Sequence, residues 1–178
     1  SWYNETLYQK KAELLTAFRT VYPDIIGAYE KIRFSTKNLP ESQFLYGEQA
    51  PEPLLVTENG VQFATYLNEG LMTGIFLDQK EVRGRLVDGF AVGKTVLNMF
   101  SYTGAFSVAA AMGGAVATTS VDLAKRSLPK TTEQFEVNHL NLAAQKIIVM
   151  DVFDYFKYAS RKGFSYDMII LDPPSFAR

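Results

Sequence analysis

The stretch Thr95-Val96-Leu97-Asn98-Met99-Phe100-Ser101-Tyr102-Thr103-Gly104 decides the fold, because a short apolar run ends there in a polar turn with one glycine. Residues 95–100 predict a buried strand. The small-residue run 105–112, closed by Gly113-Gly114, predicts a helix directly after the turn. A strand, a tight turn and a helix in this order are the first half of a parallel βαβ unit.

The same order of strand and helix repeats downstream. Further strands are predicted at 117–122, 146–151 and 166–172, and further helices at 128–139, with Ser127 as its N-cap, and at 152–161. Strands that alternate with helices of this length predict an α/β fold. We expect a doubly wound Rossmann-like sheet in residues 71–178, with its first four strands present and further strands beyond Arg178.

The residues before this sheet have a different pattern. A helix is predicted from Trp2 to Val21, a strand at 25–34 and a loop at 35–53. Two short strands, 54–57 and 61–67, flank Asn59-Gly60, the favoured pair for a two-residue hairpin turn. Residues 1–70 are therefore predicted to form a small α+β domain.

Composition narrows the class of protein. The 178 residues contain 18 Lys and Arg against 19 Asp and Glu, so the chain has no general basic surplus. Cysteine is absent, which excludes disulfide scaffolds, thiolate zinc sites and a catalytic cysteine within the chain, and we expect no metal site. No apolar run approaches the ~18–20 residues of a membrane span. We expect a cytoplasmic protein, with a homodimer left open.

Acidic residues follow three successive strands of the predicted sheet. They are Asp122, Asp151 and Asp172. In such sheets ligands bind beyond the carboxyl ends of the strands. Each aspartate taken singly is equally compatible with a cap on the following helix. Together with the turn after the first strand, the three acids favour a site for a nucleoside-containing cofactor.

The turn itself indicates which cofactor. Ser101, Thr103 and Gly104 precede a helix N-terminus, where backbone N–H groups favour a carboxylate. A dinucleotide site needs the pattern Gly-x-Gly-x-x-Gly to admit a pyrophosphate. Here the turn has one glycine, and Tyr102 and Thr103 take up the remaining space. The sequence therefore disfavours NAD and favours S-adenosylmethionine, whose methionine end carries a small carboxylate and an amine.

The next two strand ends suit the rest of that molecule. Asp122 stands where an acidic residue binds the two hydroxyls of a ribose. Asp151 is placed to accept a hydrogen bond from an adenine amino group, with Leu123 and Val152 as apolar walls. The fourth strand end, Asp172-Pro173-Pro174, offers a carboxylate and a rigid turn that would hold a planar base edge for in-line methyl transfer. The plainer alternative is a proline-rich turn.

Five motifs in order carry a family resemblance: residues 73–79 (TGIFLDQ), 96–106 (VLNMFSYTGAF), 120–122 (SVD), 151–153 (DVF) and 172–176 (DPPSF). Together they resemble the bacterial class I S-adenosylmethionine-dependent 23S rRNA methyltransferases of the RlmI/RlmK type, from about Pro23 onward. The resemblance implies contacts of Ser101, Tyr102, Thr103 and Gly104 with the methionine end, of Asp122 with the ribose and of Asp151 with the adenine.

The resemblance also implies roles outside these strand ends. Asp172 would lie between cofactor and target base, and residues 73–79 would lie over the cofactor pocket with Arg83 behind them. In this stretch Phe76, Asp78 and Gln79 are the predicted cofactor contacts. The first domain would help to hold RNA.

Two departures from the family pattern affect the prediction. Lys80 stands where relatives often have arginine after Asp-Gln, so the charge is kept and the bidentate fork is lost. The loop Asp-Pro-Pro-Ser-Phe differs from the Asn-Pro-Pro-Tyr of amino-methylating enzymes, although Phe176 could stack on a base one position later.

The predicted function is methyl transfer from S-adenosylmethionine to a base of ribosomal RNA, expected to be 23S rRNA. Cytosine carbon 5 and a guanine ring nitrogen both remain open as the target atom. The alternatives are a non-catalytic S-adenosylmethionine- or RNA-binding module and, less favoured, an NAD-dependent oxidoreductase.

Overall fold

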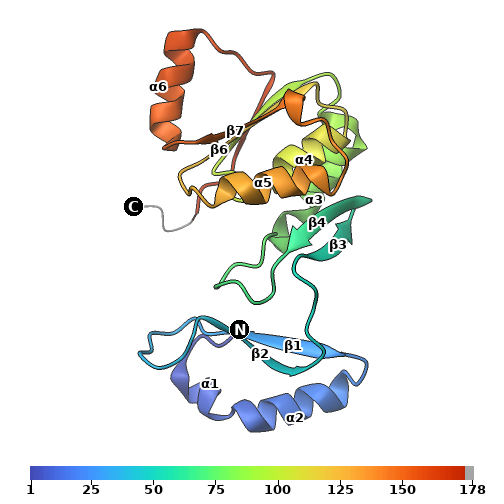
Figure 1. The fold of residues 1–178 in the computed structure, drawn as a ribbon, viewed down its shortest axis with the longest axis vertical. Helices are drawn as coiled ribbons and strands as arrows, with labels where there is room; N and C mark the ends of the chain where they lie inside the picture. The colour runs from blue at the N-terminus through green and yellow to red at the C-terminus, as the bar shows by residue number, and fades with distance from the viewer. Residues whose placement is uncertain (175–178) are drawn as a thin grey trace. The chain divides into compact units, whose positions relative to one another are not determined.

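The computed structural model describes residues 1–174 and divides into two compact units (Figure 1). The first unit comprises residues 1–54 and 65–73, and the second comprises residues 55–64 together with the chain from Gly74 onward. This division differs from the predicted boundary at residue 70 because the hairpin residues 55–64 belong with the second unit. No helix in the described part of the chain is long and apolar enough to cross a bilayer.

The first unit contains two short helices and an antiparallel strand pair. Its elements are α1 (Glu5–Gln9), α2 (Lys11–Val21), β1 (Gly27–Lys31) and β2 (Ser42–Gly47). The predicted single helix is divided at Lys10, and Asn4 caps α1 by accepting a hydrogen bond from the N–H of Leu7. The prediction of a loop throughout 35–53 is wrong, because β2 lies within it. The prolines that suggested a loop all lie outside β2, and pairing with β1 supplies its backbone partners.

A second hairpin, β3 (Leu54–Glu58) and β4 (Val61–Thr65), turns at the predicted residues. Asn59 and Gly60 have φ values of 52° and 77°, the positive values that a type I′ turn needs at both positions. The hairpin predicted from Asn59-Gly60 is confirmed.

Backbone N–H and carbonyl groups of β4 form hydrogen bonds with two side chains, one in α5 (Ser127–Glu136) and one just after it. These side chains take the place of a third strand. The Gln134 amide accepts from the N–H of Ala64 at 2.9 Å and donates to its carbonyl at 2.7 Å. One helical turn later, Asn138 makes the same two contacts with Gln62, at 2.9 and 2.7 Å. These four hydrogen bonds explain why the hairpin belongs to the second unit.

The second unit is built on a four-stranded parallel sheet. Its strands are β5 (Thr95–Met99), β6 (Ala117–Asp122), β7 (Gln145–Val149) and β8 (Met168–Leu171), in the order β7-β6-β5-β8. The chain moves outward from β5 through β6 to β7 and then returns to the other side of β5 as β8. The predicted α/β sheet is therefore confirmed, and its topological switch point lies between β5 and β8.

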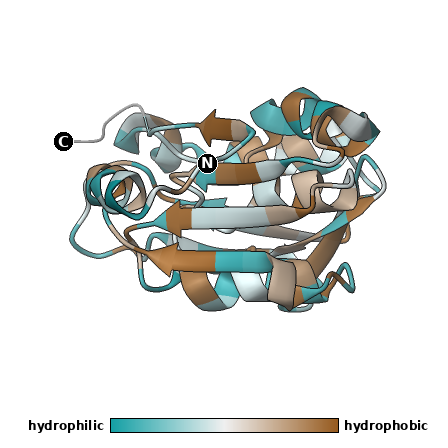
Figure 2. Ribbon diagram, turned by 90° about the horizontal axis from the view of Figure 1, so that it is seen from above, coloured by the Kyte–Doolittle hydropathy of each residue, from teal (hydrophilic) through white to brown (hydrophobic). Residues whose placement is uncertain are grey.

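Helices cover both faces of this sheet (Figures 1 and 2). On one face, α6 (Val152–Lys162) packs Val152, Tyr155 and Ala159 against Leu97 and Met99. On the other, α4 (Ala105–Met112) packs Phe106, Ala109 and Ala110 against Val96. Alternate residues of β5 thus enter different cores, as the two-residue period of a strand requires. Figure 2 shows hydrophobic residues along the strands.

Several short helical turns are not among the predicted elements. They are η1 (Leu77–Gln79), α3 (Lys80–Arg85), η2 (Leu86–Phe90) and η3 (Leu142–Ala144). One predicted cap is also wrong: Ser127 is the first residue of α5, and its hydroxyl donates to the carbonyl of Ala124 at 2.6 Å.

Candidate cofactor site

The carboxyl ends of the four parallel strands bring together residues that are far apart in the sequence. The N–H of Ser101 donates to the carbonyl of Val121 at 3.0 Å, and the N–H of Met150 donates to the carbonyl of Asp122 at 2.9 Å. On the other side, Leu171 pairs in register with Met99. The turn 101–104, Asp122, Asp151 and Asp172 therefore lie along one edge of the sheet.

The turn after β5 has an unusual backbone. Phe100, Tyr102 and Gly104 have φ values of 56°, 51° and 77°. Positive φ is unfavourable for residues with a Cβ and costs about 1–3 kcal/mol where it occurs outside glycine. Residues in such conformations cluster at ligand-binding sites, where the surrounding structure maintains them. From the sequence, a positive φ could be expected only at Gly104, because phenylalanine and tyrosine rarely adopt this conformation.

Asp122 holds this turn against the end of β6. Its Oδ2 accepts a hydrogen bond from the N–H of Tyr102 at 2.8 Å, and its Oδ1 accepts one from the N–H of Ala124 at 2.9 Å. The alternative that Asp122 caps a helix does not hold, because α5 begins only at Ser127. A carboxylate oxygen accepts more than one hydrogen bond, so both oxygens retain capacity for a pair of neighbouring hydroxyls.

Asp151, in contrast, does cap a helix. Its Oδ1 accepts from the N–H groups of Phe153 and Asp154, at 2.9 and 3.2 Å, at the start of α6. Its Oδ2 makes no hydrogen bond to a residue that the structure describes. The cap fixes the direction of the carboxylate and leaves one oxygen for a ligand.

One predicted apolar wall needs correction. Val152 is 4% exposed and packs in the core with Leu97 and Met99, so its side chain does not line a ligand site. Phe153, which the sequence reasoning missed, is 67% exposed at the same strand end, and Leu123 is similarly exposed. Val152, the first residue of α6, faces the sheet, and Phe153, the next residue, faces outward. With Asp151 taken as the N-cap, the helical periodicity of the following residues predicts this difference.

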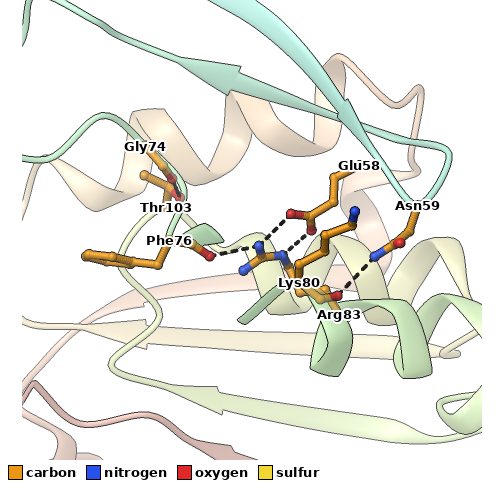
Figure 3. A network of polar contacts seen from close by, with 7 residues as sticks. All are labelled: Glu58, Asn59, Gly74, Phe76, Lys80, Arg83 and Thr103. Atoms are coloured by element: carbon orange, nitrogen blue, oxygen red, sulfur yellow. Dashed lines mark hydrogen bonds and ion pairs between the residues drawn. The ribbon is translucent and has the colours of Figure 1, made fainter. Parts of the chain in front are cut away.

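The segment 74–76 lies against the turn after β5 (Figure 3). The Thr103 hydroxyl donates to the carbonyl of Gly74 at 2.6 Å, and the ring centroids of Phe76 and Tyr102 are 5.5 Å apart. Asp78 and Gln79 follow in η1, and their side chains make no described hydrogen bond to the strand-end acids. Of the three predicted contacts in this stretch, the structure thus places Phe76 beside the turn.

The last predicted residues follow β8. Asp172 is half-buried, whereas Pro173 and Pro174 are exposed. Phe176, predicted to stack on a base, lies outside the described residues.

A buried polar network beneath the turn was not predicted. Asn98 donates from Nδ2 to the hydroxyl of Ser107 at 3.0 Å, and this hydroxyl lies 2.7 Å from that of Ser120. Asn98 Oδ1 is buried without a hydrogen-bond partner in the described structure. An asparagine in an otherwise apolar strand is the sequence signal for such a network.

Comparison with known proteins decides the family. Residues 26–178 match the family model described as S-adenosylmethionine-dependent methyltransferase. The chain belongs to this methyltransferase family. The resemblance inferred from the five motifs is confirmed.

Individual relatives and solved structures point to the same family. YwbD of Bacillus subtilis is 55% identical over 99% of this chain, which covers 45% of YwbD. The Aeromonas salmonicida protein named ribosomal RNA large subunit methyltransferase I is 36% identical over 93% of this chain, which covers 42% of that protein. Among solved structures, SMU.776, a methyltransferase complexed with SAH, matches with a TM-score of 0.93 and 62% identity, over 99% of this chain and 45% of that one. The chain thus spans less than half of the length of these relatives.

The groups at the carboxyl edge fit the family's cofactor, S-adenosylmethionine. The ribose diol needs acceptors, and Asp122 presents two oxygens with remaining capacity. The amino acid end needs donors, and α4 begins directly after the turn without a side-chain cap, so the N–H groups of its first turn are available there. The adenine needs an acceptor and apolar surfaces, and Asp151, Leu123 and Phe153 present such groups at this edge.

Proposed function

We propose that this chain binds S-adenosylmethionine at the carboxyl edge of its sheet and contributes to methyl transfer to a base of ribosomal RNA. The observation that carries the proposal is Asp122, whose two oxygens join the ends of β5 and β6 and still have acceptor capacity. The family membership supports the cofactor, and the names of the relatives support the RNA substrate.

Each part of the edge has a proposed role in cofactor binding. The turn Ser101, Tyr102, Thr103 and Gly104 surrounds the methionine end, with α4 behind it. Asp122 accepts hydrogen bonds from the ribose hydroxyls. Asp151 accepts from the adenine amino group through Oδ2, while Leu123 and Phe153 cover the ring faces.

When bound, S-adenosylmethionine supplies an electrophilic methyl group. Asp172, Pro173 and Pro174 follow the strand next to the turn, on the far side of the switch point from Asp122. A carboxylate in a proline-fixed loop holds a base edge in one orientation, and orientation is a large part of the rate enhancement in a displacement reaction. We therefore assign Asp172 the role of orienting the target base.

The target atom separates two chemistries. Methylation of cytosine carbon 5 needs a thiolate that first attacks the ring, and these 178 residues contain no cysteine. Methylation of a guanine ring nitrogen needs no such nucleophile. We propose a base of 23S rRNA as the substrate. The identity of the methylated nucleoside would distinguish cytosine carbon 5 from a guanine ring nitrogen as the target atom.

Cofactor binding is tested by calorimetric titration of the chain with S-adenosylhomocysteine and, separately, with NADH. We expect binding of S-adenosylhomocysteine alone. Tight binding of NADH would replace the proposal with the oxidoreductase alternative.

The RNA substrate is tested by mass spectrometry of nucleosides from the rRNA of a strain that lacks the gene. We expect one methylated base to disappear, to return with the wild-type gene and to remain absent with an Asp172→Ala gene. An unchanged set of methylated bases, together with S-adenosylhomocysteine binding, would support the non-catalytic binding module instead.

A further inference from the structure

Arg83 in α3 is a buried charged residue outside the strand ends. It is 2% exposed, and its guanidinium donates from Nε to Glu58 Oε1 at 2.7 Å and from Nη2 to Glu58 Oε2 at 2.9 Å. The ring centroids of Phe63 and Phe106 lie 5.7 and 5.9 Å from the guanidinium carbon of Arg83. A buried ion pair often contributes no more to stability than apolar residues of the same size, so we ask what else this pair holds in place.

A third hydrogen bond of Arg83 points toward the candidate site (Figure 3). Its Nη2 also donates to the carbonyl of Phe76 at 2.8 Å. The planar guanidinium has five N–H donors in fixed directions, so one side chain reaches the carboxylate and the carbonyl together. Lysine, with a single ammonium, has no equivalent geometry.

The hairpin β3–β4 fixes the helix that carries Arg83. Next to Glu58, the side chain of Asn59 donates from Nδ2 to the carbonyl of Lys80 at 3.0 Å, at the start of α3. Two neighbouring residues of one turn thus hold α3 at two points, 80 and 83. The position of the guanidinium is therefore determined by the hairpin and not by α3 alone.

Three consecutive residues beside the turn are fixed in different ways. The carbonyl of Gly74 accepts from the hydroxyl of Thr103, Ile75 is 9% exposed in the hydrophobic core, and the carbonyl of Phe76 accepts from Arg83. The Phe76 side chain, in contrast, is 47% exposed, with its ring centroid 5.5 Å from that of Tyr102. A fixed backbone with an exposed ring beside a ligand-binding turn is the arrangement of a preformed wall.

We propose that Arg83 is a positioning residue for the cofactor: through the carbonyl of Phe76 it holds the Phe76 ring as one wall of the pocket next to Tyr102. Glu58 orients the guanidinium for this contact. The inference rests on the proposed function, since it assumes that the turn after β5 binds S-adenosylmethionine.

A double-mutant cycle on the full chain separates positioning from a purely structural role. Arg83→Lys and Phe76→Ala are each expected to weaken S-adenosylhomocysteine binding by about tenfold, measured by calorimetry below the melting temperature of every variant. The double variant is expected to bind as weakly as Phe76→Ala alone, because Arg83 acts only through that ring. If Arg83→Lys does not fold, Glu58→Gln replaces it in the cycle with the same expected pattern.

The matched control is Tyr155→Phe in α6, which removes a buried hydroxyl contact with Tyr166 and leaves segment 74–76 untouched. It is expected to lower the melting temperature without changing affinity. Additive losses of affinity in the cycle, or an Arg83→Lys affinity equal to wild type, would overturn the inference while leaving the proposed function intact. Absence of S-adenosylhomocysteine binding by the wild-type chain would instead contradict the proposed function.

Discussion

The carboxylate of Asp122, at the end of β6, accepts a hydrogen bond from the backbone N–H of Tyr102, in the turn after β5, at 2.8 Å. This contact joins two strand ends that are 20 residues apart in the sequence. It also stabilises a tyrosine with a φ of 51°, since the N–H that donates belongs to that residue. The residue proposed to bind the ribose therefore also shapes the turn proposed to bind the methionine end.

Replacing Asp122 with alanine should remove both effects. We expect S-adenosylhomocysteine affinity to fall by about ten- to a hundredfold, because hydrogen bonds to a charged acceptor contribute about 1.5–3 kcal/mol. Calorimetric titration measures this. Asp154→Ala is the control, since the Asp154 side chain is exposed and its carboxylate pairs with Lys157 on the surface of α6, at 3.0 Å. The N–H of Asp154, which donates to Asp151, is kept in this variant. A folded Asp122→Ala variant with wild-type affinity would contradict the ribose assignment.

Gly104 is the second position of the turn where a single substitution is informative. Its φ is 77°, and a Cβ built on it would lie 2.5 Å from Cγ2 of Thr131 in α5. Gly104→Ala should therefore lower the free energy of unfolding by about 1–3 kcal/mol, from backbone strain and steric overlap together. Urea denaturation measures the loss.

Thr131→Ser separates the two causes, because serine lacks the methyl group that the new Cβ would meet. In the Gly104→Ala background it should recover part of the lost stability, and the remaining loss reports the positive φ. If Thr131→Ser recovers no stability, the structure relieves the overlap with the Thr131 methyl group in another way. The positive φ at residue 104 alone would then account for the loss of stability.

The amide of Gln134 supports a third prediction, on the attachment of the hairpin. Gln134→Leu should lower the free energy of unfolding by about 2–4 kcal/mol, because it leaves the buried N–H and carbonyl of Ala64 without their side-chain partner. Asn138→Ala removes the equivalent pair at Gln62, but at a more exposed position. Its effect should be smaller, since water can replace the lost partner. Equal effects of the two variants in urea denaturation would argue against this explanation.

Local sequence signals predicted the elements that depend on local interactions. The turn at Asn59-Gly60, the helix 105–112 and the alternation of strands and helices after Thr95 all follow from residue preferences within a few positions. The strand-end acids were also found this way, because parallel strands bring their carboxyl ends to one edge.

What the sequence did not reveal depends on distant partners. Strand β2 acquires its backbone hydrogen bonds from β1, and the hairpin is attached to α5 through Gln134, which is 70 residues from Ala64. The placement of Val152 in the core and of Phe153 outside it depends on where α6 begins, and an uncertainty of one residue there exchanges the two roles. Local preference contains no information on such contacts.

Glu30 makes the stability of the first unit depend on pH. It is 1% exposed, and its carboxylate accepts hydrogen bonds from the Lys11 ammonium, at 2.7 Å, from the Trp2 indole, at 2.8 Å, and from the Gln43 amide. Burial by itself raises the pKa of Glu30, but these three donors and the charge of Lys11 outweigh burial and hold the pKa below its usual range. A carboxyl group with a lowered pKa in the folded state stabilises the fold above its unfolded pKa, and this contribution is lost as the pH falls through the folded pKa.

Trp2 is the only tryptophan in the chain, so its fluorescence reports this contact directly. We expect the emission to stay constant from neutral pH down to the ordinary pKa of a glutamate. It should change only below that pKa, when Glu30 becomes protonated and loses the charge that binds Lys11 and Trp2. Glu30→Gln should remove this transition, because glutamine does not titrate. Glu13→Gln, at an exposed position of α2, should retain it. A transition of the same midpoint and amplitude in Glu30→Gln would assign it to another carboxyl group.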